Sequence, residues 1–252
     1  MKGHHLLDGK CVVITAAAGS GIGFATALRC AEEGAKVVLS DVHERRLGEA
    51  ADKLTPLLGA RPLSVLCDVT KEPDVAELFT RTLSTHDRID ILVNNAGLGG
   101  TQKLVDMSDE EWLRVIDVTL HGTFRCTRRA LRHMTEQRAG VIVNNASVLG
   151  WRAQAGQAHY AAAKAGVMAL TRSAALEAAP FGVRVNAVAP SLAMHPFLKK
   201  VSSEALLDEL TQREAFGRAA EPWEVANVIV FLASDYSTYM TGEVISVSSQ
   251  HP

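Results

Sequence analysis

Short runs rich in Val, Ile and Leu alternate along the whole chain with longer segments in which apolar residues recur at helical spacing. Nearly continuous apolar runs of this length are typical of strands that are buried on both faces of a sheet. The predicted strands are Cys11–Thr15, Lys36–Ser40, Pro62–Cys67, Ile89–Val93, Val141–Asn145, Val183–Val188 and Glu243–Val247. The predicted helices are Ile22–Glu33, Glu44–Leu58, Asp74–Thr85, Asp109–Gln137, Gln157–Ala179 and Pro222–Ala233.

Strands that alternate with helices are joined by right-handed crossovers, which makes neighbouring strands parallel. The pattern therefore predicts an α/β fold, a doubly wound parallel sheet of seven strands with helices on both faces. No linker rich in Pro, Gly or Ser divides the sequence, so we expect residues 1–252 to form a single domain.

The segment at about 191–218 interrupts the alternation and contains one helix-like stretch, roughly 202–212. It follows the sixth predicted strand, and an insertion at the carboxyl edge of an open parallel sheet is a suitable place for a substrate lid. A solvated surface excursion fits the same spacing.

Composition excludes several classes of protein. Lys plus Arg number 26 and Asp plus Glu 28, a net charge of −2, so we expect no nucleic-acid partner. The four cysteines are scattered without metal-ligand or disulfide spacing, which predicts no metal site and a reducing compartment. The sequence also shows neither a signal-peptide core nor an apolar run of about 20 residues, so we expect a cytoplasmic protein with no membrane partner.

A glycine-rich turn joins the first predicted strand to the first predicted helix, with the sequence Thr15-Ala-Ala-Ala-Gly-Ser-Gly-Ile-Gly. Gly19 and Gly21 let the backbone approach a pyrophosphate, Gly23 lets helix and strand pack closely, and the helix N-terminus attracts the anion. A turn that merely needs a positive φ is the simpler alternative. The residues expected to bind a dinucleotide here are Thr15, Gly19, Ser20, Gly21, Ile22 and Gly23.

Two acidic residues end the next two predicted strands. Asp41 lies 18 residues beyond Gly23, where a carboxylate accepts both ribose hydroxyls of NAD and repels the 2′-phosphate of NADP. We therefore expect NAD as the cofactor, with NADP disfavoured. Asp68 ends the third strand, where an acid either contacts the adenine edge or caps a turn.

An acid/base pair follows the fifth predicted strand. Tyr160 and Lys164 are spaced i, i+4 on a predicted helix, so their side chains share one face. A nearby ammonium favours the phenolate form of a tyrosine, whose ordinary pKa is about 10. Tyr160 is then suited to exchange a proton with a substrate oxygen while hydride moves, and Ser147, 13 residues earlier, is suited to bond the same oxygen.

With these motifs the chain resembles the short-chain dehydrogenase/reductase family from about residue 7 to residue 247. The resemblance rests on the glycine-rich turn, Asp41, Asp68-Val, Asn94-Asn-Ala-Gly97, Ser147 with Tyr160 and Lys164, Asn186 with Pro190, and Thr241-Gly-Glu-Val-Ile. It implies a Rossmann-like sheet, a nicotinamide cofactor and carbonyl–alcohol interconversion. It also implies a homotetramer, or a homodimer, built through the fifth and sixth helices and the last strand. The further cofactor-binding residues that it implies are Asp68, Val69, Asn95, Ala96, Gly97, Tyr160, Lys164 and Pro190.

The chain departs from the family pattern at several positions. Its glycine-rich turn lacks the first glycine and is one residue longer than usual. Thr119 stands where an Asn usually completes a catalytic tetrad with Ser147, Tyr160 and Lys164, which changes the expected proton relay. Ser191 replaces a Gly, His195 stands where a Thr commonly meets the carboxamide, and the sequence ends Ser-Ser-Gln-His-Pro.

The expected substrate side of the site combines apolar groups with one arginine. Such a set suits a bulky alicyclic or acyl substrate with a distant anion. Packing of Trp151 in a subunit interface and a solvated Arg152 are the alternative interpretation. The candidate substrate residues are Leu98, Ser147, Leu149, Trp151, Arg152, Gln154, Leu192 and His195.

The predicted function is that of an NAD-dependent enzyme interconverting a secondary alcohol and a ketone on a small-molecule substrate. The sequence NNASVLGWRAQ is also similar to actinobacterial reductases of late sterol-ring degradation, whose substrates are perhydroindane propionates or their CoA esters. An enzyme like the 3-oxoacyl-carrier-protein reductases is one alternative, although Asp41 suits their NADPH poorly. A non-catalytic dinucleotide sensor or scaffold is the alternative from another class.

Overall fold

Seven parallel strands form one central sheet. The structure is a computed structural model that describes residues 3–194, 198 and 204–250. The strands are β1 (Cys11–Ile14), β2 (Lys36–Asp41), β3 (Ser64–Leu66), β4 (Ile91–Asn94), β5 (Gly140–Asn145), β6 (Val183–Pro190) and β7 (Val244–Val247). Their order across the sheet is β3-β2-β1-β4-β5-β6-β7, and every neighbouring pair is parallel.

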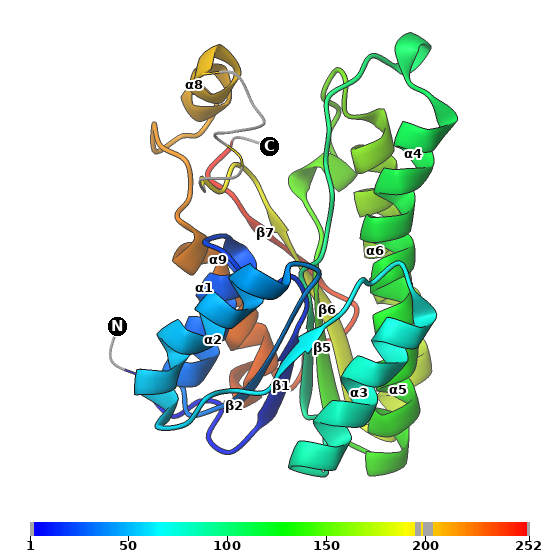
Figure 1. Cartoon of the computed structure of the whole chain (residues 1–252). Coiled ribbons are helices and arrows are strands. Elements are labelled where there is room, and N and C mark those ends of the chain that lie inside the picture. The colour runs from blue at the N-terminus through cyan, green and yellow to red at the C-terminus, as the bar shows by residue number, and fades with distance from the viewer. Residues whose placement is uncertain (1–2, 195–197, 199–203, 251–252) are drawn as a thin grey trace.

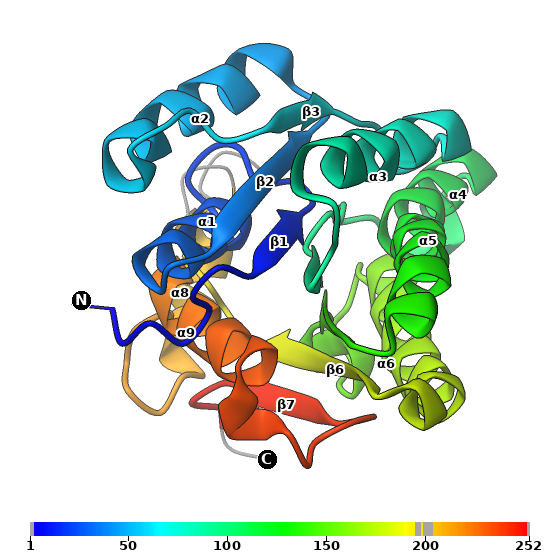
Figure 2. The same ribbon diagram turned by 90° about the horizontal axis from the view of Figure 1, so that it is seen from below.

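Helices cover both faces of this sheet (Figures 1 and 2). The helices on one face are α1 (Ile22–Glu32), α2 (Glu44–Leu58) and α9 (Pro222–Ala233). The helices on the other are α3 (Glu72–His86), α4 (Asp109–Ile116), α5 (Gly122–Gln137) and α6 (Ala158–Ala178). The predicted doubly wound, Rossmann-like architecture is confirmed.

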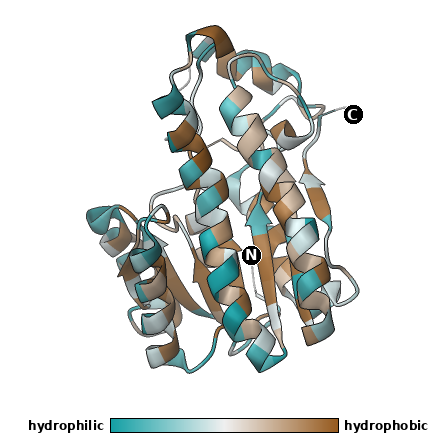
Figure 3. Cartoon of the chain, turned by 90° about the vertical axis from the view of Figure 1, so that its right-hand side faces the viewer, coloured by the Kyte–Doolittle hydropathy of each residue, from teal (hydrophilic) through white to brown (hydrophobic). Residues whose placement is uncertain are grey.

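Alternate residues of the central strands supply two separate cores. Val12 and Ile14 of β1 pack in the cluster under α1, α2 and α9, whereas Val13 packs in the cluster under α3, α5 and α6. All three side chains are fully buried, as expected because successive strand residues point to opposite faces. Figure 3 shows the strands as a largely hydrophobic layer behind helices of mixed character.

The predicted helix over residues 109–137 is interrupted. A π-helical turn, Asp117–His121, lies between α4 and α5, and Thr119 is buried in the middle of it. Such a turn is a single wider turn within a helix, and the residues on both sides of it have helical spacing, so the pattern predicted one continuous helix. Turns of this kind are frequent at functional sites.

Two isolated β-bridges hold the segment at about 191–218 near its ends. Ala193 forms a bridge with Ala220, and Glu214 forms an antiparallel bridge with Gln250. Between them lies α8 (Glu204–Gln212), which projects beyond the sheet at the top of Figure 1. Among the described residues, no helix has the length and apolar character needed to cross a bilayer.

The packing predicts opposite effects for two glycine-to-alanine substitutions in helices. A Cβ at Gly122 of α5 would lie 2.6 Å from Val69 Cγ2, whereas a Cβ at Gly48 of α2 would meet nothing closer than 3.7 Å. Gly122→Ala should lower the free energy of unfolding by about 1–3 kcal/mol through overpacking. Gly48→Ala should raise it by about 0.5–1 kcal/mol, because alanine loses less backbone entropy in a helix. Urea titration of both variants measures the difference, and equal effects would refute the packing argument.

Candidate active site

The glycine-rich turn leaves the N-terminus of α1 open toward the carboxyl edge of the sheet. Gly19 has φ +90°, and Gly21 caps α1 without any side-chain hydrogen bond or acidic residue in the first turn. A Cβ at Gly23 would lie 2.2 Å from the Ala16 carbonyl oxygen and 2.4 Å from Asn95 Nδ2. Only glycine therefore allows this close approach, as the sequence predicted. Ser20 is exposed in the turn, and Ile22 is the first residue of α1.

Thr15 and Asn95 join the turn to the ends of β4 and β5. Thr15 Oγ1 accepts hydrogen bonds from the backbone amides of Asn95 and Ala96, both at 3.0 Å. Asn95 Nδ2 donates to the carbonyl oxygen of Ala16 at 3.0 Å, and Asn95 Oδ1 accepts from Asn145 Nδ2 at 3.0 Å. These two side chains fix the loop edges that a cofactor would contact.

Asp41 lies at the end of β2 beside the turn. Its carboxylate accepts from the amides of Ala18 at 3.2 Å and His43 at 2.9 Å, and the residue is buried. Burial raises the pKa of Asp41, while the Ala18 amide and the Arg46 charge act in the opposite direction. The side chain is thus held where the sequence placed a ribose-binding acid.

Asp68 caps the turn that follows β3. Its Oδ1 accepts from both the amide (3.0 Å) and the hydroxyl (2.7 Å) of Thr70. Burial opposes ionisation, but the bonds from Thr70 and the nearby Lys71 outweigh it, and the pKa of Asp68 is lowered. The neighbouring Val69 is buried against Gly122 of α5. Of the two interpretations of Asp68, the turn cap is present, and a contact with adenine stays a prediction.

Ser147, Tyr160 and Lys164 come together at the carboxyl end of β5. Ser147 follows this strand directly and accepts a hydrogen bond from the Leu149 amide at 3.2 Å. Lys164, one turn after Tyr160 on α6, is buried and donates to the backbone carbonyl of Asn145. Its Nζ lies 5.5 Å from the centre of the Tyr160 ring. The predicted shared helix face is confirmed.

Burial controls the protonation of this group. Burial raises the pKa of the Tyr160 phenol, and a hydrogen bond with Ser147 lowers it to a smaller extent. Burial lowers the pKa of Lys164 from 10.5 to about 8. In the protein alone, the pKa of the phenol therefore lies above its ordinary value. The reason is that both groups lose water when they fold against each other.

Thr119 contacts the loop around Leu98, which lies against Tyr160 and Lys164. Its hydroxyl accepts from the Leu98 amide at 3.0 Å and donates to the Leu98 carbonyl at 3.1 Å. The loop then passes over α6, since a Cβ at Gly97 would lie 3.4 Å from Lys164 Nζ and one at Gly99 3.6 Å from the Tyr160 ring. Thr119 thus holds this loop against Lys164 and Tyr160.

His159 also belongs to this group, although the sequence reasoning missed it. The residue is buried, and its Nδ1 accepts a hydrogen bond from the Tyr160 amide at 2.9 Å. Its Nε2 lies 3.3 Å from the position of a Cβ at Gly100. A histidine directly before the tyrosine at a helix start was the available signal.

The candidate substrate residues are divided between the surface and the interior. Trp151 is 52% exposed, whereas Leu192 is buried. Leu149 and Gln154 are half-buried in the segment between Ser147 and Tyr160. Arg152 is not simply solvated, because it donates to Gln250 Oε1. His195 lies outside the described residues.

Pro190 is the buried last residue of β6. The amide of the next residue, Ser191, donates to the Val247 carbonyl at 3.1 Å. The Ser191 hydroxyl is buried and has no hydrogen-bond partner within the described part of the chain. A polar group without a partner at this edge is available to a bound molecule.

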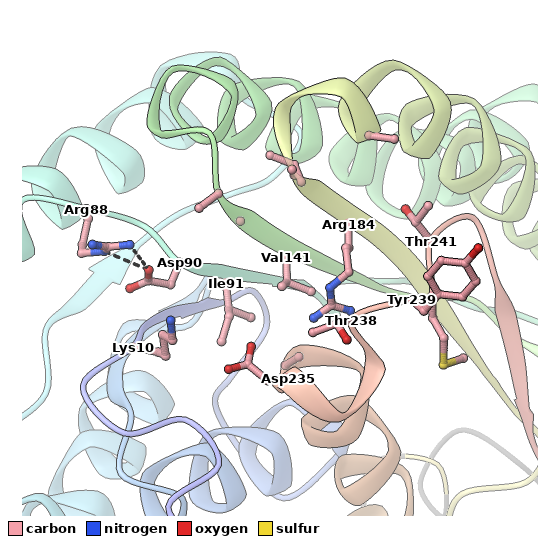
Figure 4. A pocket seen from close by; sticks show the side chains of 17 residues that line it. Lys10, Arg88, Asp90, Ile91, Val141, Arg184, Asp235, Thr238, Tyr239 and Thr241 are labelled. Carbon is pink, nitrogen blue, oxygen red and sulfur yellow. Dashed lines mark hydrogen bonds and ion pairs between the residues drawn. The ribbon is translucent and has the colours of Figure 1, made fainter.

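A hollow of about 580 Å³ lies at the amino ends of the strands (Figure 4), and its lining does not include Ser147, Tyr160 or Lys164. Both of its arginines already have internal partners. Arg88 donates to Asp90 at 2.8 Å, and Arg184 donates to the carbonyls of Leu232 and Ser234 at 2.9 and 3.0 Å. This hollow therefore provides no alternative to the site at the carboxyl edge.

Known proteins match this chain over nearly its full length. A family model described as enoyl-(acyl carrier protein) reductase matches residues 16–249. The chain is 64% identical over 253 residues to the (5R,7aS)-5-hydroxy-7a-methyl-1-oxo-2,3,5,6,7,7a-hexahydro-1H-indene-carboxyl-CoA reductase of Mycobacterium tuberculosis, covering 100% of this chain and 97% of the relative. The crystal structure of a short chain dehydrogenase from Mycobacterium smegmatis superposes with a TM-score of 0.89 at 58% identity, covering 100% of this chain and 97% of that one.

Two further relatives are more distant. The 3-oxoacyl-[acyl-carrier-protein] reductase FabG of Thermotoga maritima is 43% identical, covering 96% of this chain and 97% of the relative. The cis-4-hydroxycyclohexanecarboxylate dehydrogenase of Sinomonas cyclohexanicum is also 43% identical, covering 94% of each protein.

Burial of Lys164 predicts a pH-dependent stability. Because the pKa of Lys164 is about 8 in the folded chain and 10.5 when exposed, its charge destabilises the fold fully below pH 8, and this cost disappears as the pH rises to 10.5. Lys164→Met should therefore exceed the wild type in unfolding free energy by up to about 3 kcal/mol at pH 7, and the excess should shrink between pH 8 and 10.5. Urea titrations across this range measure it, with the exposed Lys103→Met as control. A constant difference would contradict the lowered pKa.

Proposed function

The chain belongs to the short-chain dehydrogenase/reductase family of oxidoreductases, and from this premise we propose the reaction and the roles of its residues. We propose that it interconverts a secondary alcohol and a ketone by NAD-dependent hydride transfer. The proposed substrate is alicyclic or acyl, with a CoA thioester as one form. The observation that carries this proposal is the Tyr160 side chain at the carboxyl edge of β5. Its phenol forms a hydrogen bond with Ser147, and the Lys164 Nζ lies 5.5 Å from the centre of its ring.

The residues at this edge fit a nicotinamide dinucleotide. The open N-terminus of α1 suits the pyrophosphate. The glycine at position 23 lets α1 lie close to Ala16 and Asn95 beside it. The Asp41 carboxylate suits the two ribose hydroxyls, and the unpartnered Ser191 hydroxyl is free to meet the nicotinamide end. Such a group supplies or accepts the hydride when it is bound.

The remaining chemistry is proton transfer by the chain itself. In the direction of reduction, the Tyr160 phenol gives its proton to the carbonyl oxygen that becomes the alcohol, and in oxidation it takes the proton back. Burial raises the pKa of the phenol, so the phenol holds the proton that it donates in reduction. The Ser147 hydroxyl bonds the same oxygen, and Lys164 is placed to exchange protons because its own pKa is about 8.

Thr119 takes a positioning role in this proposal. Its hydroxyl both donates to and accepts from Leu98, which leaves one lone pair for any water or for Lys164. We therefore assign to Thr119 the support of the loop over Tyr160 and Lys164 before any part in a proton relay.

The relatives support a ring-bearing or acyl substrate. The 64% identical relative is named for an indene-carboxyl-CoA, and a 43% identical one for a hydroxycyclohexanecarboxylate. The 3-oxoacyl-carrier-protein reductase remains the second candidate because one relative at 43% identity carries that name. Asp41 argues against it to the extent that such an enzyme depends on NADPH. The non-catalytic alternative would leave the intact group of Ser147, Tyr160 and Lys164 without a use.

A homotetramer or homodimer in the cytoplasm remains part of the proposal. A hollow of about 470 Å³ lies between α5 and α6, lined in part by Phe124, Leu131 and Phe181. Phe124 and Phe181 are about 40% exposed, which suits a surface covered by a second copy. The segment at about 191–218 is likewise proposed as a substrate lid.

Loss of the phenol should abolish most of the activity. Tyr160→Phe removes the transferable proton and should lower kcat on the order of 10² to 10⁴, with the dissociation constant for NADH changed less than about threefold. Absorbance at 340 nm follows turnover of cyclic ketones and acyl thioesters, and calorimetry follows NADH. The exposed Tyr236→Phe serves as control. Full turnover in Tyr160→Phe would refute the assignment.

The carboxylate of Asp41 should decide between the two dinucleotides. Asp41→Asn keeps the size but removes the charge that repels a 2′-phosphate, so the ratio of kcat/KM for NADH over NADPH should fall about tenfold or more. Asp68→Asn, on the neighbouring strand end, should leave the ratio unchanged. An unaltered ratio in Asp41→Asn would remove this residue from cofactor discrimination.

A further inference from the structure

The buried carboxylate of Glu214 has no role in the proposed reaction, yet it joins distant parts of the chain at the carboxyl edge of the sheet. Glu214 is 4% exposed. It accepts from the Ser249 hydroxyl at 2.8 Å, the Ser249 amide at 3.3 Å, the Gln250 side-chain amide at 3.0 Å and the Leu192 amide at 3.4 Å. One side chain thus connects the end of the 191–218 segment with the beginning of the same segment and with the residues after β7.

Gln250 extends this chain of hydrogen bonds to Arg152. Its Nε2 donates to Glu214, while its Oε1 accepts from the Arg152 guanidinium. A side-chain amide is the group that can accept from a cation and donate to an anion at once. A carboxylate at this position would repel Glu214, and an apolar side chain would hold neither neighbour. The backbone bridge between Glu214 and Gln250 keeps the two residues adjacent.

Arg152 is held in the segment between Ser147 and Tyr160. Its amide donates to the Val148 carbonyl at 2.9 Å, just after Ser147. The side chain is half-buried, and in the described part of the chain the guanidinium bonds only Gln250. Four of its five N–H groups are therefore left for an anion, which an arginine binds in bidentate fashion.

We propose that Glu214 and Gln250 are positioning residues that aim Arg152 at an anionic group of the substrate, and that this Glu214–Gln250–Arg152 chain sets the preference for charged over neutral substrates. The inference rests on the proposed function and adds to it the residues that select the substrate. It assigns a use to the unusual C-terminal sequence, whose Gln250 is the link. A substrate carboxylate and the phosphates of CoA are both anions, and the Arg152 guanidinium would bind either one through the same hydrogen bonds.

A matched pair of alcohols tests the proposal. The oxidation of cis-4-hydroxycyclohexanecarboxylate and of its neutral methyl ester is followed with NAD at 340 nm in full-length enzyme. The wild type should show a lower KM for the acid than for the ester. Gln250→Ala should raise the KM for the acid about 3- to 10-fold, and Gln250→Glu, which captures Arg152 in an ion pair, should raise it about 10-fold or more. Neither variant should change kcat, or the KM for the ester, more than about twofold.

Glu214→Gln tests the far end of the chain. It should raise the KM for the acid about threefold or more while the KM for NAD stays constant. Glu49→Gln on α2, whose carboxylate forms an exposed ion pair with Arg45, is the matched control and should resemble the wild type. A merely structural role would raise both KM values together, and that result would overturn the inference.

The two proposals fail in different ways. If the wild type oxidises neither compound, the proposed substrate class is wrong, and the inference is then decided by calorimetry of the acid on the enzyme–NADH complex of wild type and Gln250→Glu. Equal affinity in the two proteins, or no binding to either, overturns it. If the wild type oxidises both compounds without preferring the acid, the proposed function stands and the inference falls.

Discussion

The bond from the buried Lys164 amine to the backbone carbonyl of Asn145 ties α6 to the edge of the sheet. This bond requires the end of β5 to lie beside α6, and buried polar side chains hold the two elements in that position. Asn94 donates to Asn144 at 2.8 Å and Asn144 donates to Thr171 of α6 at 2.9 Å, all of them buried. Breaking either bond would leave another buried amide atom without a partner, which favours this alignment of β4, β5 and α6. The site inherits its geometry from that alignment.

Several charged or ionisable groups at this edge are buried without a bonded partner of opposite charge in the described part of the chain. Asp41 and Glu214 are held by amide and hydroxyl donors, and Lys164 by a carbonyl. Backbone dipoles balance the loss of water less completely than a full charge does. The edge is therefore a place where charge is held at a cost to stability, which is typical of a site prepared to meet charged ligands.

The sequence was sufficient wherever a local pattern determined the structure. Apolar runs located the strands, glycine spacing located the close approach at Gly23, and the i, i+4 spacing placed Tyr160 and Lys164 on one face. It was insufficient where contacts join distant segments. Arg152 and Gln250 are 98 residues apart, and nothing near either one announces the other. The protonation of Tyr160 also depended on burial, which the spacing alone does not measure. The π-helical turn was not predicted, because the residues on both sides of it have helical spacing.

That turn has a consequence for how the chain tolerates length changes. Each helical residue rotates the chain by about 100°, so the extra residue within Asp117–His121 sets the side chains of α4 at a different angle from those of α5. The carbonyl oxygen of Thr119 is occupied by the Thr123 hydroxyl at 2.8 Å. Deleting a single residue here would give a longer and more regular helix, yet it would rotate Thr119 away from Leu98. A regular helix through this position and the observed contact of Thr119 with Leu98 are therefore incompatible.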